Sequence, residues 1–144
     1  ALAIVLLSVG GYMGGTLVNR NQIGVDHRYA DAGKWQETTV ERTSGPVVIA
    51  DADDLTVDQM KLVHVSGSRI ALGRTEEGYA AFDDRCTHKG GPLADGTLIC
   101  GTVQCPWHGS QFDVKSGKVK CGPAKKAIAT HKLEESNGQV RLVS

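Results

Sequence analysis

Two short segments of the chain carry residue types that bind transition metals. One residue separates Cys86 from His88, two residues separate Cys105 from His108, and sixteen residues lie between the two pairs. Glycine and proline flank both pairs, which predicts loops at the ends of strands, where a rigid sheet can display them. Two soft thiolates and two imidazoles brought together at loop tips form a metal site.

The spacing alone leaves two kinds of metal site open. Four ligands of the type Cys2His2 can hold one structural zinc ion in a tetrahedron. A single ion does not explain why two matching loops each offer one cysteine and one histidine, with no helix to carry the histidines. A binuclear cluster explains this arrangement, because one iron can take both thiolates and the other both imidazoles.

The two segments, CTHKGGPL and CPWHGSQFD, closely resemble the cluster-binding boxes of the Rieske 2Fe-2S family. The family pattern extends over about residues 35–144. The resemblance implies that Cys86 and Cys105 bind the inner iron, and that His88 and His108 bind the outer, solvent-facing iron, of one 2Fe-2S cluster per chain. With two thiolates the oxidised cluster is electrically neutral, so it accepts an electron more readily than a cluster with four. The resemblance therefore implies a one-electron carrier that catalyses nothing alone.

Six further residues are expected around the cluster: Lys89, Gly91, Trp107, Ser110, Phe112 and Pro123. The resemblance places Gly91 and Trp107 where high-potential members have a disulfide bond, and Phe112 where they have a tyrosine. Ser110 matches their serine, and Pro123 lies in a Gly-Pro-Ala motif that resembles the loop covering the cluster. Each lost hydroxyl donor lowers the reduction potential by roughly 60 mV, so we expect a low to intermediate potential. We interpret Trp107 as a hydrophobic shield, and Lys89 as a solvated lysine or an attractor of an acidic partner.

The other candidate residues have structural interpretations. Cys100 and Cys121 are expected to be free, partly buried thiols, and Asp113 a structural hydrogen-bonding residue. The remaining histidines, His27, His64 and His131, are expected to be surface or strand residues and not ligands.

The elements that position these loops are predicted to be mostly β-strands. The chain has 18 glycines among 144 residues and only 5% aromatic residues, which favours short strands joined by tight turns. Residues 61–65 and 69–74 predict a hairpin that turns at Gly67 and Ser68. Further strands are predicted at residues 78–82, 97–99, 102–104, 111–114, 128–133 and 139–143, with a short helical turn at 52–59. The predicted fold is a Rieske-like antiparallel β-sandwich with a small cluster-binding lobe over residues 85–123.

The first 18 residues form an uncharged apolar run, ALAIVLLSVGGYMGGTLV. As a helix the run would be about 27 Å long, close to the hydrocarbon thickness of a bilayer. The segment GYMGGTLVNRNQIGVDH, residues 11–27, resembles the last helix and exit of a bacterial membrane domain of unknown function that occurs fused to Rieske domains. We therefore expect a transmembrane helix at residues 1–18, the end of a longer segment, then a tether at 19–34 and the Rieske domain at 35–144. Cations at positions 20, 28 and 34 favour a cytoplasmic location of the domain.

The sequence thus predicts a membrane-tethered Rieske electron carrier whose partner is a redox protein or a membrane electron carrier. The alternatives are a soluble ferredoxin of a ring-hydroxylating dioxygenase, a small Rieske-like subunit of a reductase such as nitrite reductase, and a structural zinc module. An oxygenase would need a mononuclear iron site on a further large domain, for which no residues remain. Sixteen basic residues balance sixteen acidic ones, which argues against a nucleic-acid partner.

Overall fold

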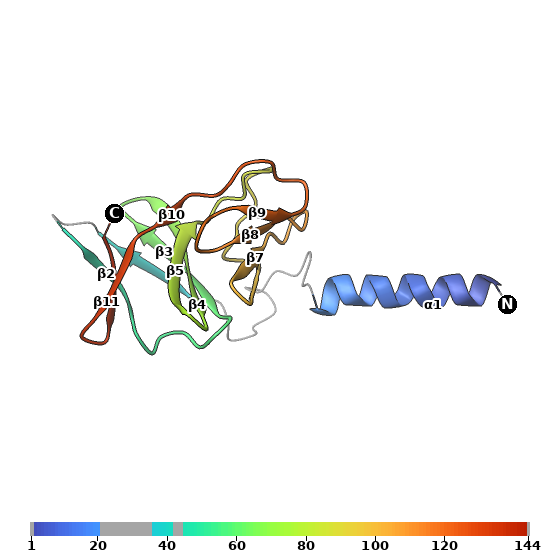
Figure 1. Cartoon of the computed structure of the whole chain (residues 1–144), viewed down its shortest axis with the longest axis horizontal. Coiled ribbons are helices and arrows are strands. Elements are labelled where there is room, and N and C mark those ends of the chain that lie inside the picture. Colours follow the sequence, from blue (N-terminus) through green and yellow to red (C-terminus); the bar gives the residue numbers. More distant parts are fainter. Residues whose placement is uncertain (1, 21–35, 42–44, 144) are drawn as a thin grey trace.

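The computed structural model describes residues 2–20, 36–41 and 45–143. An N-terminal helix extends away from a β domain that holds both candidate ligand loops (Figure 1). The described residues form twelve strands in three sheets. The mostly β architecture predicted from the sequence is confirmed.

The largest sheet, sheet A, has the strand order β1-β3-β4-β5-β10. Its strands are β1 (Glu37–Val40), β3 (Met60–Val65), β4 (Ser68–Thr75), β5 (Gly78–Asp83) and β10 (Thr130–His131). Strand β1 runs parallel to β3, whereas the other pairs of this sheet are antiparallel. The prediction of a purely antiparallel sandwich was wrong at β1, which is joined to β3 through β2 of another sheet and not by a hairpin.

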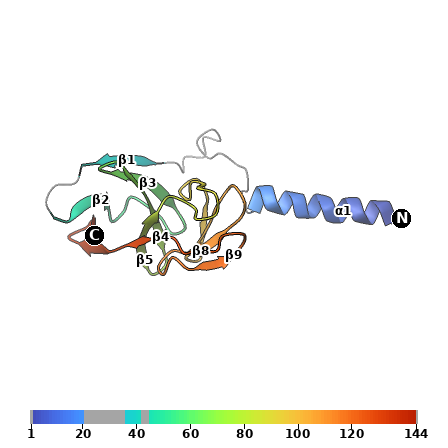
Figure 2. The same ribbon diagram turned by 90° about the horizontal axis from the view of Figure 1, so that it is seen from above.

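Two smaller sheets flank sheet A (Figure 2). Sheet B has the order β11-β12-β2, with β11 (Leu133–Ser136), β12 (Gln139–Leu142) and β2 (Val47–Asp51). The third sheet contains β6 (Thr97–Ile99), β7 (Thr102–Gln104), β8 (Gln111–Asp113) and β9 (Val119–Cys121) in sequence order. This sheet and the loops around it, residues 85–126, are called the cluster lobe below.

Three hairpins use two-residue turns in which both residues have positive φ, as the right-handed twist of the strands favours. Asn137 and Gly138, at φ 53° and 73°, join β11 to β12. Ser66 and Gly67 join β3 to β4, one residue earlier than predicted, since Val65 pairs with Ser68. Cys100 takes the first position of the third turn at φ 47°, which gives this cysteine a structural place between β6 and β7.

Sheet A is the middle layer, with an apolar core on each face. Successive residues of a strand point to opposite faces, so Leu62 and Phe82 pack toward the cluster lobe, whereas Val63 and Ala81 pack toward sheet B. Cys86 and Cys105 belong to the core on the lobe side. The two thiols therefore lie at the boundary between the packed interior and the loops.

Two predicted elements differ in the structure. Residues 52–59 form turns and no helix, because the carboxylate of Asp54 accepts the Asp51 N–H (3.1 Å) and binds Lys61 (2.8 Å) instead of capping a helix. The predicted strand at 128–133 is divided between β10 and β11, since the chain leaves sheet A and joins sheet B at Lys132.

The N-terminal helix, α1 (Leu2–Gly15), has 14 residues, and none of them is buried. A π-helical turn follows at Thr16–Arg20, where the Thr16 hydroxyl donates to the Tyr12 carbonyl (2.8 Å) and competes with the regular helical ladder. Among the described residues, no helix is long and apolar enough to cross a membrane. The structure therefore does not support the transmembrane helix predicted at residues 1–18, and most of the predicted tether, residues 21–34, lies outside the described residues.

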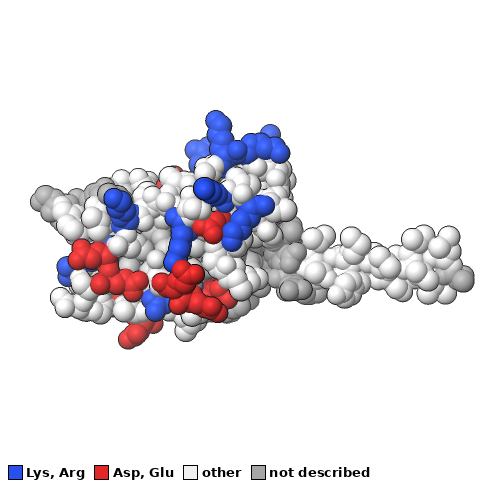
Figure 3. Space-filling model, viewed as in Figure 1, with Lys and Arg blue, Asp and Glu red and all other residues white. Residues whose placement is uncertain are grey.

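Charges are segregated on the β domain. In the view of Figure 3, Lys and Arg side chains gather along the upper edge, while Asp and Glu gather toward the lower edge. The cluster lobe contains seven basic and two acidic residues, whereas the rest of the described β domain contains five basic and twelve acidic residues. A chain of zero net charge thus has one positive and one negative end.

Candidate metal centre

The two ligand loops have the same pattern of backbone hydrogen bonds. In loop 1 (residues 86–91) the Cys86 N–H donates to the Gly91 carbonyl and the Gly90 N–H donates to the Cys86 carbonyl, both at 2.8 Å. In loop 2 (residues 105–110) Cys105 and Ser110 repeat the first bond at 2.8 Å, and the Gly109 N–H donates to the Cys105 carbonyl at 3.1 Å. Each loop therefore closes on itself and presents a cysteine and a histidine at fixed positions.

Glycine is needed at the fifth position of both loops. Gly90 and Gly109 have φ values of 79° and 72°, a region that side chains with a Cβ disfavour. This conformation turns the chain so that its N–H reaches back to the cysteine carbonyl. The repeated use of glycine explains why both sequence segments are rich in this residue.

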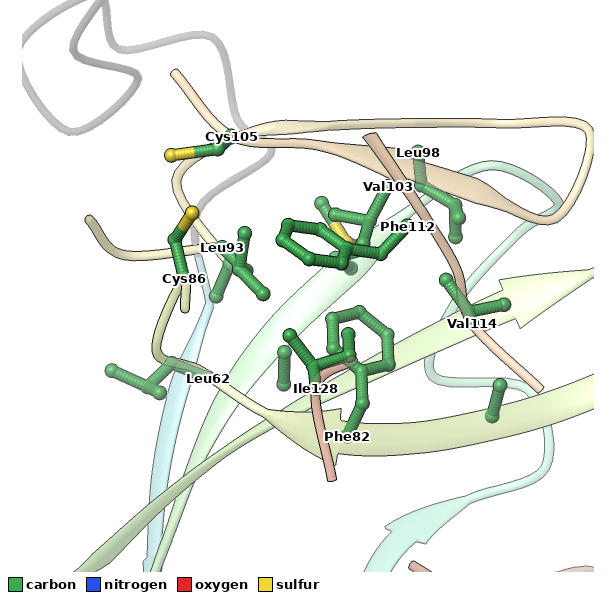
Figure 4. Packing of buried hydrophobic residues seen from close by; sticks show 14 of the residues in the cluster. Leu62, Phe82, Cys86, Leu93, Leu98, Val103, Cys105, Phe112, Val114 and Ile128 are labelled. Atoms are coloured by element: carbon green, nitrogen blue, oxygen red, sulfur yellow. The ribbon is translucent and has the colours of Figure 1, made fainter. Parts of the chain in front are cut away.

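The two thiols lie close together at the edge of the buried core that borders the ligand loops (Figure 4). Cys86 and Cys105 are 3% and 1% exposed. Burial, and then the neighbouring Cys86, raise the pKa of the Cys105 thiol to about 11, although the backbone N–H groups of Trp107 and His108 point at its sulfur and lower the pKa in part. The thiol keeps its proton at neutral pH unless a metal ion replaces it.

The two imidazoles form a second pair beside the thiols. The ring centroids of His88 and His108 are 4.9 Å apart, and the rings are nearly perpendicular at 87°. His108 is exposed, whereas His88 is half-buried. Partial burial lowers the pKa of His88, and the neighbouring His108 and Lys89 lower it further, so the neutral ring that can bind a metal is favoured.

One polar atom at this site lacks a partner among the described residues. The Nδ1 atom of His88 is buried and makes no hydrogen bond there. A buried nitrogen of this kind is costly unless it binds a proton donor or a metal ion. The donor set, with a thiol pair, an imidazole pair and this nitrogen, therefore fits a metal cluster. Across residues 2–20, 36–41 and 45–143, no three His, Cys, Asp or Glu side chains come together as ligands of a single ion.

Gly91 and Trp107 close the space between the loops. A Cβ atom added at Gly91 would lie 2.9 Å from the Cys105 sulfur and 3.0 Å from two ring atoms of Trp107. Trp107 is 54% exposed. Its ring packs edge to face against the His108 ring, with the ring centroids 6.5 Å apart. Trp107 thus lies over loop 1 beside the thiols, in the position that its interpretation as a shield requires.

A third segment, residues 122–126, touches both loops and is called the cover segment. The hydroxyl of Ser110, which is fully buried, accepts the Ala124 N–H at 3.2 Å. The Thr87 hydroxyl donates to the Lys126 carbonyl at 2.6 Å. Pro123 itself is exposed. The Gly-Pro-Ala motif therefore lies against the ligand loops, as the resemblance implied.

Asp84, which the sequence analysis did not single out, anchors loop 1 to sheet A. Its side chain is fully buried, with Oδ2 accepting from Arg69 Nε (2.9 Å) and Nη2 (2.7 Å), and Oδ1 accepting the Ala94 N–H (2.6 Å). The Asp84 carbonyl accepts the Leu93 N–H at 3.2 Å. One residue therefore holds the chain just before loop 1 to the chain just after it. A buried aspartate has no sequence signal that separates it from an exposed one.

The remaining predicted residues lie outside the centre. Phe112 is fully buried in the core beneath the thiols, and Lys89 is exposed beside His88. His64 and His131 bind Glu37 and Asp83, and His27 lies outside the described residues. Cys100 and Cys121 are free, as predicted, but exposed and not partly buried. Asp113 accepts the N–H and hydroxyl of Ser116, both at 2.8 Å, which fits its structural interpretation.

Comparison with known proteins identifies the class to which this geometry belongs. The Rieske 2Fe-2S domain matches residues 45–132, so the chain belongs to the Rieske family, and its cofactor is the 2Fe-2S cluster. It is of the ferredoxin type, an electron carrier rather than a catalyst. These predictions from the sequence are confirmed.

The relatives include ferredoxin components of dioxygenase systems. The ferredoxin of the naphthalene 1,2-dioxygenase/salicylate 5-hydroxylase systems of Ralstonia sp. is 37% identical over 90 residues, which cover 62% of this chain and 86% of the relative. The naphthalene 1,2-dioxygenase ferredoxin of Pseudomonas putida is 35% identical over 80 residues, covering 56% and 77%. The apolar helix lies outside the region matched to the family.

Solved structures agree with this assignment. A chain in the complex of reduced oxygenase and oxidised ferredoxin of carbazole 1,9a-dioxygenase is 26% identical, with a TM-score of 0.65, covering 67% of this chain and all of that one. The carbazole 1,9a-dioxygenase ferredoxin of Nocardioides aromaticivorans shares the fold, with a TM-score of 0.66 and coverage of 69% and 98%.

Proposed function

We propose that Cys86 and Cys105 bind one iron of the cluster and that His88 and His108 bind the other. The pairing of thiol with thiol and imidazole with imidazole in two self-closed loops is the observation that carries this assignment. The unpartnered Nδ1 atom of His88 supports it. When bound, the cluster supplies reversible one-electron oxidation and reduction.

The protein residues divide the remaining tasks. His108 is exposed, so its ring offers a route for an electron between the interior and a docked partner. Trp107 and the buried core beneath Cys86 and Cys105 keep water from the sulfur side. The Trp107 and His108 N–H groups that point at the Cys105 sulfur stabilise negative charge there.

We propose a low to intermediate reduction potential. Gly91 and Trp107 provide no disulfide bond between the loops, and Phe112 provides no hydroxyl, which leaves Ser110 as the side-chain hydroxyl beneath loop 2. A redox titration of the holoprotein with a midpoint above about +200 mV, near the upper limit for Rieske centres, would contradict this proposal.

The catalytic partner that we propose is a separate, larger oxygenase chain. The curated relatives are ferredoxin components of dioxygenase systems, and one similar solved structure is a ferredoxin–oxygenase complex. These likenesses support the soluble-ferredoxin alternative more than the membrane-tethered interpretation.

A second proposal concerns location. The helix α1 is apolar on all sides and has no buried residue, which supports membrane association. The cations at positions 20, 28 and 34 support a cytoplasmic location of the Rieske domain. The 14 residues of α1 correspond to about 21 Å, less than the hydrocarbon core. Deletion of residues 1–19 should release the protein from the membrane fraction. Equal fractionation of the full and shortened chains would support the free ferredoxin instead.

The ligand assignment is tested by electron paramagnetic resonance of the dithionite-reduced holoprotein. We expect a Rieske signal, two irons and two acid-labile sulfides per chain, and loss of the signal in Cys86→Ser and His108→Ala. The matched controls are Cys121→Ser and His64→Ala, which lie outside the loops and should retain the signal. One zinc ion with no acid-labile sulfide would support the zinc module and exclude the carrier.

A further inference from the structure

The positive end of the molecule coincides with the end that bears the ligand loops. The cluster lobe has a net formal charge of plus five, from seven basic and two acidic residues. The rest of the described β domain has a net charge of minus seven, from five basic and twelve acidic residues. Such a separation orients a protein in the field of a charged partner before contact.

Three lysines lie at the ligand loops themselves. Lys89 follows His88 in loop 1, and Lys125 and Lys126 lie in the cover segment. The Thr87 hydroxyl holds the Lys126 carbonyl at 2.6 Å, which ties these lysines to loop 1. All three are exposed, and no described acidic side chain forms an ion pair with them.

Two of the other three lysines of the lobe are neutralised locally. Lys115 binds Glu77, and Lys120 binds Asp113 at 3.4 Å, whereas Lys118 is exposed and has no ion pair among the described residues. Three of the four unpaired lysines of the lobe therefore lie in loop 1 and the cover segment, where their charge neutralises no described carboxylate. This distribution favours a role in recognition over a role in stability.

Loop 2 exposes two aromatic rings next to each other. Trp107 is 54% exposed next to the exposed His108 ring. An exposed tryptophan with a charged rim is typical of the centre of a protein–protein interface.

We propose that the tip formed by Lys89, Trp107, His108 and the Lys125–Lys126 pair docks a redox protein through an acidic surface on that protein. The inference rests on the proposed electron-carrier function and adds the chemistry of the partner. The partner's carboxylates meet the lysines, while Trp107 and His108 meet the surface through which the electron passes. The acidic far end is repelled by the same partner and turns the tip toward it.

The first test measures the local potential without any electron transfer. Trp35→Phe leaves Trp107 as the single tryptophan of the chain, and its fluorescence is quenched by 4-carboxy-TEMPO (anionic), 4-amino-TEMPO (cationic) or 4-hydroxy-TEMPO (neutral). At about 10 mM ionic strength, where the Debye length is about 30 Å, we expect the anionic probe to quench about threefold more than the cationic probe. Near 1 M salt the two should become equal.

Charge-reversal variants separate the tip from the net charge. Lys125→Glu/Lys126→Glu should invert the ratio of anionic to cationic quenching. Adding Asp53→Lys and Glu134→Lys, exposed residues outside the lobe, restores the net charge, and the ratio should remain inverted. Equal quenching by the anionic and the cationic probe in the parent protein would overturn the proposal. A ratio of anionic to cationic quenching that the lysine variants leave unchanged would overturn it as well.

The second test uses the reduced holoprotein and small inorganic oxidants. Each protein gives one electron, which reduces ferricyanide to ferrocyanide or hexaamminecobalt(III) to the cobalt(II) state. We expect the rate with ferricyanide to fall about tenfold from 10 mM to 500 mM salt, and the rate with the cobalt complex to rise. Salt-independent rates would overturn the charged tip, whereas a protein that forms no cluster and oxidises with neither reagent would overturn the proposed function.

A lipid surface is the competing occupant. Poly-L-glutamate should protect Trp107 from the neutral nitroxide in the parent protein and not in Lys125→Glu/Lys126→Glu. Sedimentation with phosphatidylglycerol vesicles should be the same for both proteins. If the lysine variant alone loses vesicle binding, the tip recognises anionic lipid and the proposal of a protein partner is wrong.

Discussion

Asp84 joins both sides of loop 1 to sheet A, so its replacement tests how the centre is held in place. Asp84→Ala removes three hydrogen bonds to the carboxylate and leaves the Ala94 N–H without its partner. Loss of one partner from a buried ion pair costs about 3–5 kcal/mol. Arg69 is half exposed, which places the expected cost at the lower end, about 3 kcal/mol.

The thermal midpoint is the appropriate measurement, because cluster loss makes unfolding irreversible. For a domain of this size about 3 kcal/mol corresponds to a decrease of roughly 10 °C at a fixed scan rate. Asp84→Asn retains an acceptor for the Ala94 N–H and should lose about half as much. Circular dichroism in the visible range should report loss of the centre at the same temperature as far-UV unfolding, or below it.

Glu77→Gln is the control, since Glu77 pairs with Lys115 on the surface, where both side chains are exposed. Exposed pairs contribute about 0–1 kcal/mol, so this variant should melt within about 3 °C of the parent. If Asp84→Ala melts as high as Glu77→Gln, the idea that Asp84 anchors loop 1 is refuted.

Three further predictions concern the centre and its support. Gly91→Ala should lower the iron content by more than half, because its Cβ would lie 2.9 Å from the Cys105 sulfur; near-full iron and sulfide content would refute this. Ser110→Ala should lower the midpoint potential by roughly 60 mV, because the buried hydroxyl accepts a backbone N–H and keeps its own proton to donate; an unchanged midpoint in a redox titration would show that it donates elsewhere. Asp113→Asn should lower the thermal midpoint at pH 7. The bonds from Ser116 lower the pKa of Asp113, so its contribution is present above the unfolded pKa of about 3.9 and is lost as the pH falls through the folded value. The gap between the parent and Asp113→Asn should narrow as the pH falls below about 4, and a constant gap would contradict this origin.

Several parts of the fold follow from local sequence signals. Asn137-Gly138 predicts its hairpin because few other pairs accept positive φ at both positions. Ser66-Gly67 makes the same turn, but glycine followed by serine suggested a turn one residue later. The cysteine and histidine pairs could be located from spacing alone, since few other arrangements repeat one cysteine and one histidine in each of two glycine-rich loops.

Other parts depend on contacts between distant segments. Strand β1 pairs with β3 in parallel across more than twenty residues, and no local pattern encodes that choice. The absence of a helix at residues 52–59 depends on Lys61, which takes the Asp54 carboxylate. Asp84 and Thr87 support loop 1 through partners far along the chain, so their roles could not be predicted without the fold.

Strand β1 has a mechanical consequence for a carrier that is held at its N-terminus. The chain enters sheet A at β1, on the edge opposite β10, and β3 and β4 separate it from β5, whose end leads into loop 1. A force on the chain before β1 would therefore act first on the hydrogen bonds between β1 and β3. Strands β3 and β4 lie between these bonds and the end of β5 that leads into loop 1. Force applied at the N-terminal side of the domain would thus reach the edge of sheet A farthest from loop 1.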